Sequence, residues 1–192
     1  MASPYDDEIW RLVPEEPGPP EPHLRDFVLS LPDVERALDL GCGDGRLTDD
    51  LRAARTVGAD VSEVALQRAR KRLPDAELRL VEPDQPLPFE DSSFDLVLCA
   101  ETVEHVRDAQ LLLSEARRVL RPGGELALTT PAHGRRTGLA IIGVGFERVF
   151  PPLSPHLRFL SRRSLATLLD DMGFDVGSLE RRRGTLLARA TR

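Results

Sequence analysis

The chain has 192 residues, 41% of them hydrophobic and 30% charged, with a formal net charge of −6 at pH 7. This balance is typical of a soluble globular protein with one domain and a real core. No run approaches the roughly 18 apolar residues of a membrane span, and the acidic start MASPYDDEIW lacks the apolar centre of a secretion signal. Two cysteines are too few for a disulfide-stapled secreted fold, so we expect a cytoplasmic protein without a membrane partner.

The charge is uneven along the chain. Residues 131–192 hold eleven arginines and only five acidic residues, a surplus that would attract an anionic partner. However, the whole chain uses arginine in place of lysine, and Lys71 is its single lysine. We therefore attribute the surplus to composition and do not expect a nucleic-acid partner.

The N-terminal part is predicted to form an extended arm over residues 1–22. Its stretch PEEPGPPEP, at 14–22, suits neither a helix interior nor a central strand, because proline lacks the backbone donor and fixes φ. Residues 23–192 are predicted to form a single domain that begins with a short helix over 23–30.

Strand and helix patterns alternate through the body of the chain. We predict strands at 36–40, 56–60, 77–81, 94–100 and 124–130. We predict helices at 46–54, 62–72, 107–120 and 162–172, with Ser62 and Ser161 as N-caps. The alternation predicts an α/β fold with a mostly parallel sheet, which 174–180 and 184–190 would close as an antiparallel hairpin.

Residues 131–160 interrupt the alternation. A connection of this length usually forms a lid or a binding loop. Its apolar middle, 139–150, is expected to pack over a ligand or on the sheet edge rather than lie in water. We expect this insertion to lie on the substrate side of the domain.

The segment ALDLGCGDGRL, residues 37–47, places three glycines after the first predicted strand. Gly-Lys-Ser or Gly-Lys-Thr would end a triphosphate loop, but Arg46 follows Gly45 here. A dinucleotide loop is spaced G-x-G-x-x-G, whereas this loop reads G-x-G-x-G and contains the acidic Asp44. A carboxylate facing a pyrophosphate is electrostatically unfavourable, so neither phosphate ligand fits.

Acidic residues suggest what the loop binds instead. Asp60 ends the second predicted strand, where a carboxylate can accept both hydroxyls of a ribose. Asp39 and Asp44 suit a cationic group near the loop, such as the ammonium of an amino acid. Adenosine joined to an amino-acid tail is S-adenosylmethionine, which we predict as the cofactor.

Four ordered motifs carry a family resemblance. They read VERALDLGCGDGRL, TVGADVSEVALQRAR, PLPFEDSSFDLVLCAETVEHV and EARRVLRPGGELALTTP. The chain resembles the small, single-domain class I S-adenosylmethionine-dependent methyltransferases from about residue 36 to 130, and more weakly to 176. The resemblance implies a Rossmann-like, doubly wound, seven-stranded sheet with helices on both faces. It also implies methyl transfer, for which we expect a small-molecule acceptor.

The resemblance assigns cofactor contacts by matched position. Asp39 and the three glycines, Gly41, Gly43 and Gly45, would cradle the methionine part, and Asp60 would hold the ribose. Val61 would pack on the adenine and Asp84 would bind its amino group, with Glu82 as the alternative. Ala100 and Glu101 would contact the methionine end through their backbone.

His105 is the candidate catalytic base. It follows the fourth predicted strand, near the expected position of the methyl group, and an oxygen acceptor generally has to lose a proton. His23, His133 and His156 are alternatives that we expect to be non-catalytic. We leave O-, N- and C-methylation open.

Two other functions remain as alternatives. The spacing Glu101-x-x-Glu104-His105 would place three ligands on one helical face and, with His156, resembles the metal site of small-RNA 3′-end 2′-O-methyltransferases. The segment after Pro131 lacks the asparagine and glutamate of those enzymes, so we expect no metal and no RNA methylation. The second alternative is a non-catalytic protein that binds the cofactor without turnover.

Overall fold

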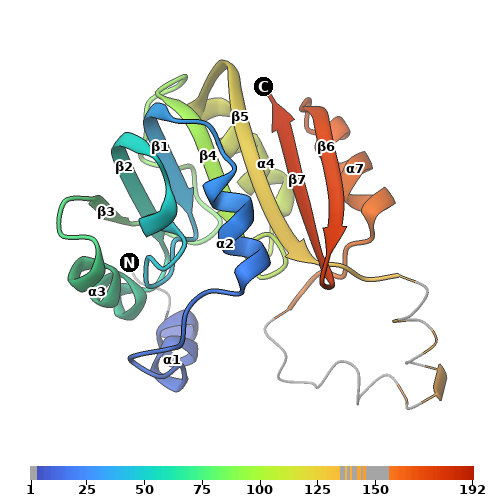
Figure 1. The fold of residues 1–192 in the computed structure, drawn as a ribbon, viewed down its shortest axis with the longest axis horizontal. Coiled ribbons are helices and arrows are strands. Elements are labelled where there is room, and N and C mark those ends of the chain that lie inside the picture. Colours follow the sequence, from blue (N-terminus) through green and yellow to red (C-terminus); the bar gives the residue numbers. More distant parts are fainter. Residues whose placement is uncertain (1–3, 135–136, 138, 140–141, 144, 146–155) are drawn as a thin grey trace.

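The computed structural model describes residues 4–134, 137, 139, 142–143, 145 and 156–192. A seven-stranded sheet with the order β3-β2-β1-β4-β5-β7-β6 forms its centre (Figure 1). The strands are β1 (Val34–Leu40), β2 (Ala53–Asp60), β3 (Glu77–Leu80), β4 (Phe94–Ala100), β5 (Leu120–Pro131), β6 (Asp175–Arg182) and β7 (Thr185–Thr191). The helices are α1 (Pro4–Leu12), α2 (Pro22–Leu29), α3 (Glu63–Arg72), α4 (Ala109–Val119) and α7 (Arg162–Asp171), with a 3₁₀ turn η1 at Thr48–Asp50.

Helices cover both faces of the sheet. On one face, α2 buries Leu24, Phe27 and Val28 against apolar residues of β1, β4, β5 and β7. On the other face, α4 and α7 pack their buried leucines onto the same strands, and Leu113 and Leu165 are fully buried there. This arrangement confirms the predicted doubly wound fold.

The pairing of the strands brings their ends to one edge. β1 pairs in parallel with β2 and β4, β2 with β3, and β4 with β5, so the carboxyl ends of all five lie together. Ligands of open α/β sheets bind beyond this carboxyl edge. In Figure 1, α1 and the described ends of residues 131–160 also lie at this edge, at the bottom of the view.

Several predicted elements are confirmed. The antiparallel β6–β7 hairpin closes the sheet through pairing of β7 with β5. Ser62 caps α3 by accepting a hydrogen bond from the Ala65 amide, and Ser161 forms a capping box with Ser164 at the start of α7. Within the described residues, every helix is too short or too polar to cross a lipid bilayer.

The helix predicted over 46–54 is wrong. Only the 3₁₀ turn Thr48–Asp50 forms, because β2 already begins at Ala53, where it pairs with Val34. The seven residues between Gly45 and Ala53 are therefore too few for the nine-residue helix predicted over 46–54. The N-terminal arm also differs from the prediction: residues 4–12 are helical, and only 13–21 lack regular structure.

The predicted helical placement of Glu101, Glu104 and His105 is wrong as well. Glu101 has a left-handed φ of 51°, which an α-helix does not accommodate, and residues 103–105 form a turn. The helix starts later, after Asp108 accepts a hydrogen bond from the Leu111 amide as its N-cap.

Most of the insertion at 131–160 lies outside the described residues. Its described apolar residues Leu139 and Ile142 are 68% and 84% exposed, so these two do not pack on the sheet edge, and the expectation that they pack over a ligand stays a prediction. Backbone hydrogen bonds from Leu157 and Arg158 to the Glu104 carbonyl return the chain to the sheet, at 2.7 and 3.2 Å.

Candidate functional site

The glycine loop connects β1 to η1 at the carboxyl edge. Gly41, Gly43 and Gly45 have φ values of 83°, 56° and 81°, a region that side chains rarely enter. The loop is closed by a hydrogen bond from the Gly45 amide to the Cys42 carbonyl, and the Gly41 amide bonds the Ala59 carbonyl of β2. The backbone path of this loop therefore depends on glycine.

The three glycines also allow three close contacts. A β-carbon at Gly41 would lie 2.3 Å from the Thr102 hydroxyl oxygen, and one at Gly45 would lie 2.6 Å from a Leu73 methyl group. A β-carbon at Gly43 would lie 2.7 Å from the Trp10 ring. Gly41 and Gly45 thus make room for packing within the domain, whereas Gly43 makes room for a side chain from the N-terminal helix.

Asp60 ends β2 directly beside this loop. Its side chain accepts hydrogen bonds from the Gly43 amide at 2.8 Å and the Ser62 amide at 2.9 Å, one on each oxygen. The residue is 8% exposed, and burial raises its pKa to about 6, against the lowering effect of these two bonds. Asp60 therefore joins the glycine loop to the turn before α3, and each oxygen keeps a further lone pair.

Asp39 and Asp44 do not form a free anionic surface. The Thr48 hydroxyl donates to Asp39 at 2.6 Å, and burial raises the pKa of Asp39 to about 7. Asp44 is buried and pairs with Arg46 at 3.0 Å. The predicted role of Asp44 as partner of a ligand ammonium is weakened, because Arg46 already compensates its charge.

The helix α1 covers the glycine loop and contacts α3. Asp7 accepts hydrogen bonds from the Ser62 hydroxyl at 2.7 Å and the Val64 amide at 3.1 Å, which fixes α1 at the start of α3. On the same helix, the Trp10 ring lies over Gly43, with the Arg68 guanidinium 5.7 Å from its centre. The sequence pattern predicts an extended arm here and does not predict that this segment is helical.

Two acidic residues follow β4. Glu101 accepts a hydrogen bond from the Thr129 hydroxyl at 2.9 Å, and burial raises its pKa. Glu104 is 1% exposed and accepts one hydrogen bond from Thr130. Burial, with the nearby Glu101 charge, raises the pKa of Glu104 to about 8.

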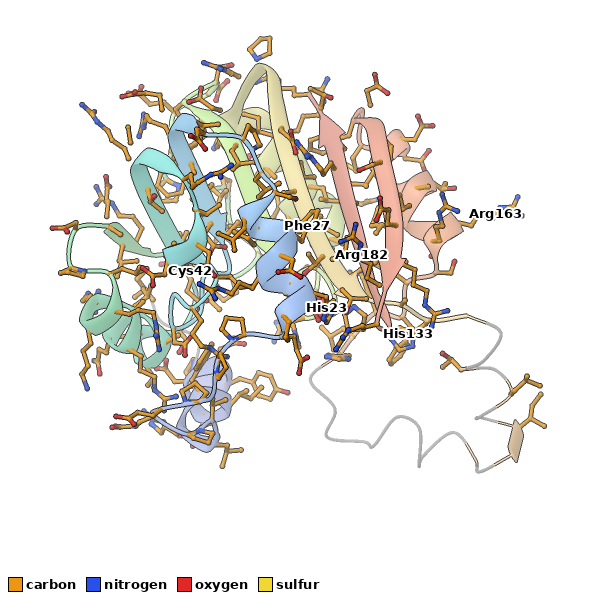
Figure 2. The ribbon with its side chains drawn as sticks, in the orientation of Figure 1. His23, Phe27, Cys42, His133, Arg163 and Arg182 are labelled. Carbon is orange, nitrogen blue, oxygen red and sulfur yellow. The ribbon has the colours of Figure 1, made fainter. Side chains whose placement is uncertain are left out.

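His105 lies beside a second histidine. Its Nε2 is 3.8 Å from Oε1 of Glu104, and the His105 and His156 rings are 4.8 Å apart between centres. His133 instead packs edge-on against Phe159, and His23 on α2 shares a hydrogen bond with Thr185 (Figure 2). The structure thus brings His105, Glu104 and His156 together and leaves His23 and His133 out of the cluster.

The other predicted contacts lie along the same edge. Val61 is half-buried after β2 and packs against the main core, and Ala100 is half-buried at the end of β4. Asp84 is exposed with a φ of 54°, and Glu82 is exposed two residues before it. Their predicted roles toward adenine and the methionine end stay predictions.

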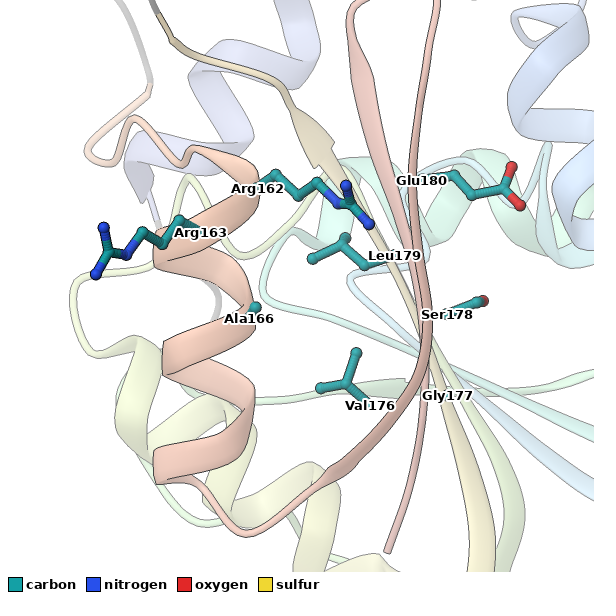
Figure 3. A pocket seen from close by; sticks show the side chains of 8 residues that line it. All are labelled: Arg162, Arg163, Ala166, Val176, Gly177, Ser178, Leu179 and Glu180. Atoms are coloured by element: carbon teal, nitrogen blue, oxygen red, sulfur yellow. The ribbon is translucent and has the colours of Figure 1, made fainter.

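Two surface hollows lie away from this edge. One, of about 730 Å³, lies between α7 and β6 and is lined by Arg162, Val176 and Leu179 among others (Figure 3). The other, of about 480 Å³, is lined by residues of η1, β2 and the turn after α3. Neither contains the glycine loop glycines or Asp60, so we place the site by its chemistry at the carboxyl edge.

Comparison with known proteins agrees with this placement. A family described as "Methyltransferase domain" matches residues 38–128, which include the glycine loop, Asp60 and the Glu101–His105 segment. A probable S-adenosylmethionine-dependent methyltransferase of Mycolicibacterium smegmatis is 35% identical over 150 residues. These similarities support a class I S-adenosylmethionine-dependent methyltransferase.

Other methyltransferases are similar to this chain over part of their own length. The ubiquinone biosynthesis O-methyltransferase of Hahella chejuensis is 30% identical, with 74% of this chain and 63% of that protein covered. The 27-O-demethylrifamycin SV methyltransferase of Amycolatopsis mediterranei is 38% identical over 49% of this chain and 38% of that protein. The match to the Mycolicibacterium smegmatis methyltransferase covers 72% of this chain but only 51% of that protein.

Solved methyltransferase structures share the fold. A putative methyltransferase from Bacillus halodurans superposes with a TM-score of 0.71 at 19% identity, covering 88% of this chain and 96% of that one. A putative Haloferax volcanii methyltransferase, in complex with the Trm112 activator, has a TM-score of 0.73 at 21% identity, with 87% of each chain covered.

The residues present fit the methyl donor of this family, S-adenosylmethionine, on two observations. The lone pairs left on the Asp60 oxygens can accept ribose hydroxyls. Gly43 carries no β-carbon, so a ligand can approach its backbone through the space above it, which we call the cradle. The Trp10 ring fills this cradle in the structure, so a donor that enters it has to displace the ring.

Proposed function

We propose that the protein transfers a methyl group from S-adenosylmethionine to a hydroxyl group of a small molecule. The observation that carries the proposal is the glycine loop at the end of β1, joined by hydrogen bonds to the buried Asp60 carboxyl of β2. The names of the Hahella chejuensis and Amycolatopsis mediterranei relatives support an oxygen acceptor of small size.

S-adenosylmethionine would bind along the carboxyl edge, with each part of it contacting different residues. Asp60 would accept the ribose hydroxyls, and the glycine loop would receive the methionine part through its backbone. Val61 would pack against the adenine, and Asp84 would bind the adenine amino group. The backbone of Ala100 and Glu101 would border the methionine end.

The protein's main contribution would be alignment. S-adenosylmethionine supplies a methyl group that its positively charged sulfur has already activated. The acceptor hydroxyl must lie in line with that methyl group, and such positioning can lower a barrier by several kcal/mol, about 7–11 at the extreme. The insertion at 131–160 would help to hold the acceptor, because its described end bonds the Glu104 backbone next to the predicted methyl position.

Calorimetry tests the donor site. Wild-type protein should bind S-adenosylmethionine and its demethylated product, and Asp60→Ala should weaken both at least about tenfold, because hydrogen bonds to a charged group contribute about 1.5–3 kcal/mol each. Asp49→Ala, an exposed carboxylate just after the loop, is the matched control and should bind normally. Equal affinity of wild type and Asp60→Ala would contradict the ribose assignment.

A methyl-release assay tests the acceptor. We expect turnover with small hydroxylated metabolites and none with short RNAs. Turnover on RNA 3′ ends alone would favour the alternative of RNA 2′-O-methylation. Donor binding without turnover on any acceptor would favour a non-catalytic cofactor-binding protein.

A further inference from the structure

Glu104, His105 and His156 form a three-residue cluster at the carboxyl edge, which we call the Glu-His-His cluster. One potential ligand atom from each residue lies within 4.8 Å of the other two. A Zn–N bond is about 2.0–2.1 Å, so two ligands of a tetrahedral ion lie about 3.4 Å apart. The ligand atoms of the three side chains would have to move closer together by little more than an ångström, and rotation of the side chains can supply this movement.

Hydrogen bonds to backbone carbonyls hold the two segments of the Glu-His-His cluster together, although they are far apart in the sequence. The Leu157 and Arg158 amides both bond the Glu104 carbonyl, and the Arg158 guanidinium bonds the Val106 carbonyl. These contacts place His156 beside His105 whether or not an ion is bound. The cluster is therefore built by the fold and does not depend on a chance approach of two surface histidines.

The Glu104 carboxyl gives an independent indication of a ligand. The residue is 1% exposed, and one of its oxygens accepts a hydrogen bond from the Thr130 hydroxyl at 3.0 Å. The other oxygen, Oε1, is buried and accepts no hydrogen bond from the described residues. A buried carboxyl oxygen without a hydrogen-bond donor destabilises the folded state, and this oxygen is the one that lies 3.8 Å from His105 Nε2.

We propose that the Glu-His-His cluster binds one divalent transition-metal ion, with Zn²⁺ as the best match. Two imidazoles and one carboxylate suit Zn²⁺ better than Mg²⁺, which prefers oxygen ligands and retains its waters. Three protein ligands also leave a fourth position open for a water or an acceptor oxygen, and an oxygen bound there loses its proton more readily. This assignment changes the predicted role of His105 from base to ligand and replaces the sequence-based expectation of a metal-free site.

Metal titration tests the cluster without any methyl donor, so its outcome is separate from that of the donor titration. The 192-residue chain, without an affinity tag, is freed of metal with a chelator and titrated with Zn²⁺ in competition with a chromophoric chelator. We expect one equivalent to bind. His105→Ala and His156→Ala should each weaken binding at least about tenfold, because each removes one of three ligands.

His133→Ala is the matched control, because His133 lies at the same edge but outside the cluster, and its metal affinity should equal that of wild type. Both cluster histidines are partly exposed, so their removal should leave the fold intact, as circular dichroism would verify. Co²⁺ in place of Zn²⁺ should give the strong visible absorption of a tetrahedral site. Absence of binding to wild type, or equal binding by wild type and both cluster variants, would overturn the proposal.

Discussion

Asp39 and Asp60 are buried carboxyl groups at the carboxyl edge of the sheet, and burial raises their pKa values to about 7 and about 6. An unfolded chain releases an aspartate proton near pH 3.9. The folded state therefore binds more protons than the unfolded state between about pH 4 and 7. The stability contributed by the protonated carboxyls is fully present below pH 4 and is lost as the pH rises through this window.

Replacement of Asp39 by asparagine should remove part of this loss of folding stability at high pH. The amide still accepts the Thr48 hydrogen bond but carries no charge. At pH 8 we expect Asp39→Asn to raise the free energy of unfolding on the order of 2 kcal/mol, and at pH 4.5 to change it much less. Urea denaturation at the two pH values measures this difference. The exposed Asp49→Asn should show no such pH-dependent gain, and an equal gain at both pH values would contradict the charge explanation.

At the scale of elements, the N-terminal helix shows a missed sequence signal. Pro4 at the first position and Asp6 and Asp7 in the first turn are typical of a helix start. The proline-rich stretch that follows dominated the sequence-based interpretation of residues 1–22. The contact of Trp10 with Gly43 joins residues 33 positions apart, so no local pattern could predict it.

Trp10 is the single tryptophan of the chain, so its fluorescence reports on α1 alone. Because its ring fills the cradle above Gly43, saturation with S-adenosylmethionine should shift its emission, and the shift should follow the calorimetric binding curve. Asp60→Ala should show the same shift only at donor concentrations at least about tenfold higher than the wild type needs. Unchanged emission at saturation would mean that the donor enters without moving the ring.

Other elements were predictable to different degrees. The strands and α3, α4 and α7 follow from apolar periodicity and from caps such as Ser62 and Ser161, whose effects are local. The helix predicted over 46–54 failed because β2 extends back to Ala53 to pair with β1, a tertiary effect. The E-x-x-E-H segment is not helical, because Glu101 has a left-handed φ. His156 lies beside the segment because Leu157 and Arg158 bond to Glu104 and the Arg158 guanidinium bonds to Val106.

At the scale of the whole molecule, the sheet supports the residues of the carboxyl edge through its packed core. Its central strands bury apolar side chains on both faces, as with Leu126 and Leu128 against α4 and α7 and Ala127 against α2. The fold could be predicted from sequence for two reasons: the central strands are apolar on both faces, and strands alternate with helices along the chain. The position of α1 could not, because it depends on how distant segments meet at the edge. The residues of the Glu-His-His cluster were indicated only by the resemblance of the E-x-x-E-H spacing, with His156, to a known metal site.

Leu128→Ala should show how much the buried core of the sheet contributes to the free energy of unfolding. The side chain is fully buried, so its truncation should lower the free energy of unfolding by about 2–5 kcal/mol through lost burial and a cavity. Chemical denaturation measures the loss. Leu12→Ala, at a position that is 86% exposed, is the matched control and should change stability by less than about 0.5 kcal/mol. Similar losses in both variants would contradict the assignment of the core.

The place of β7 in the sheet has a consequence for synthesis on the ribosome. β7 lies between β5 and β6, although it is made after both, and β6 pairs with β7 alone. A nascent chain that ends at residue 184 therefore has a sixth strand with no partner and an uncovered border on β5. Synthesis of β7 supplies the missing partner of both strands, and until then the border of β5 is open to pairing with neighbouring chains.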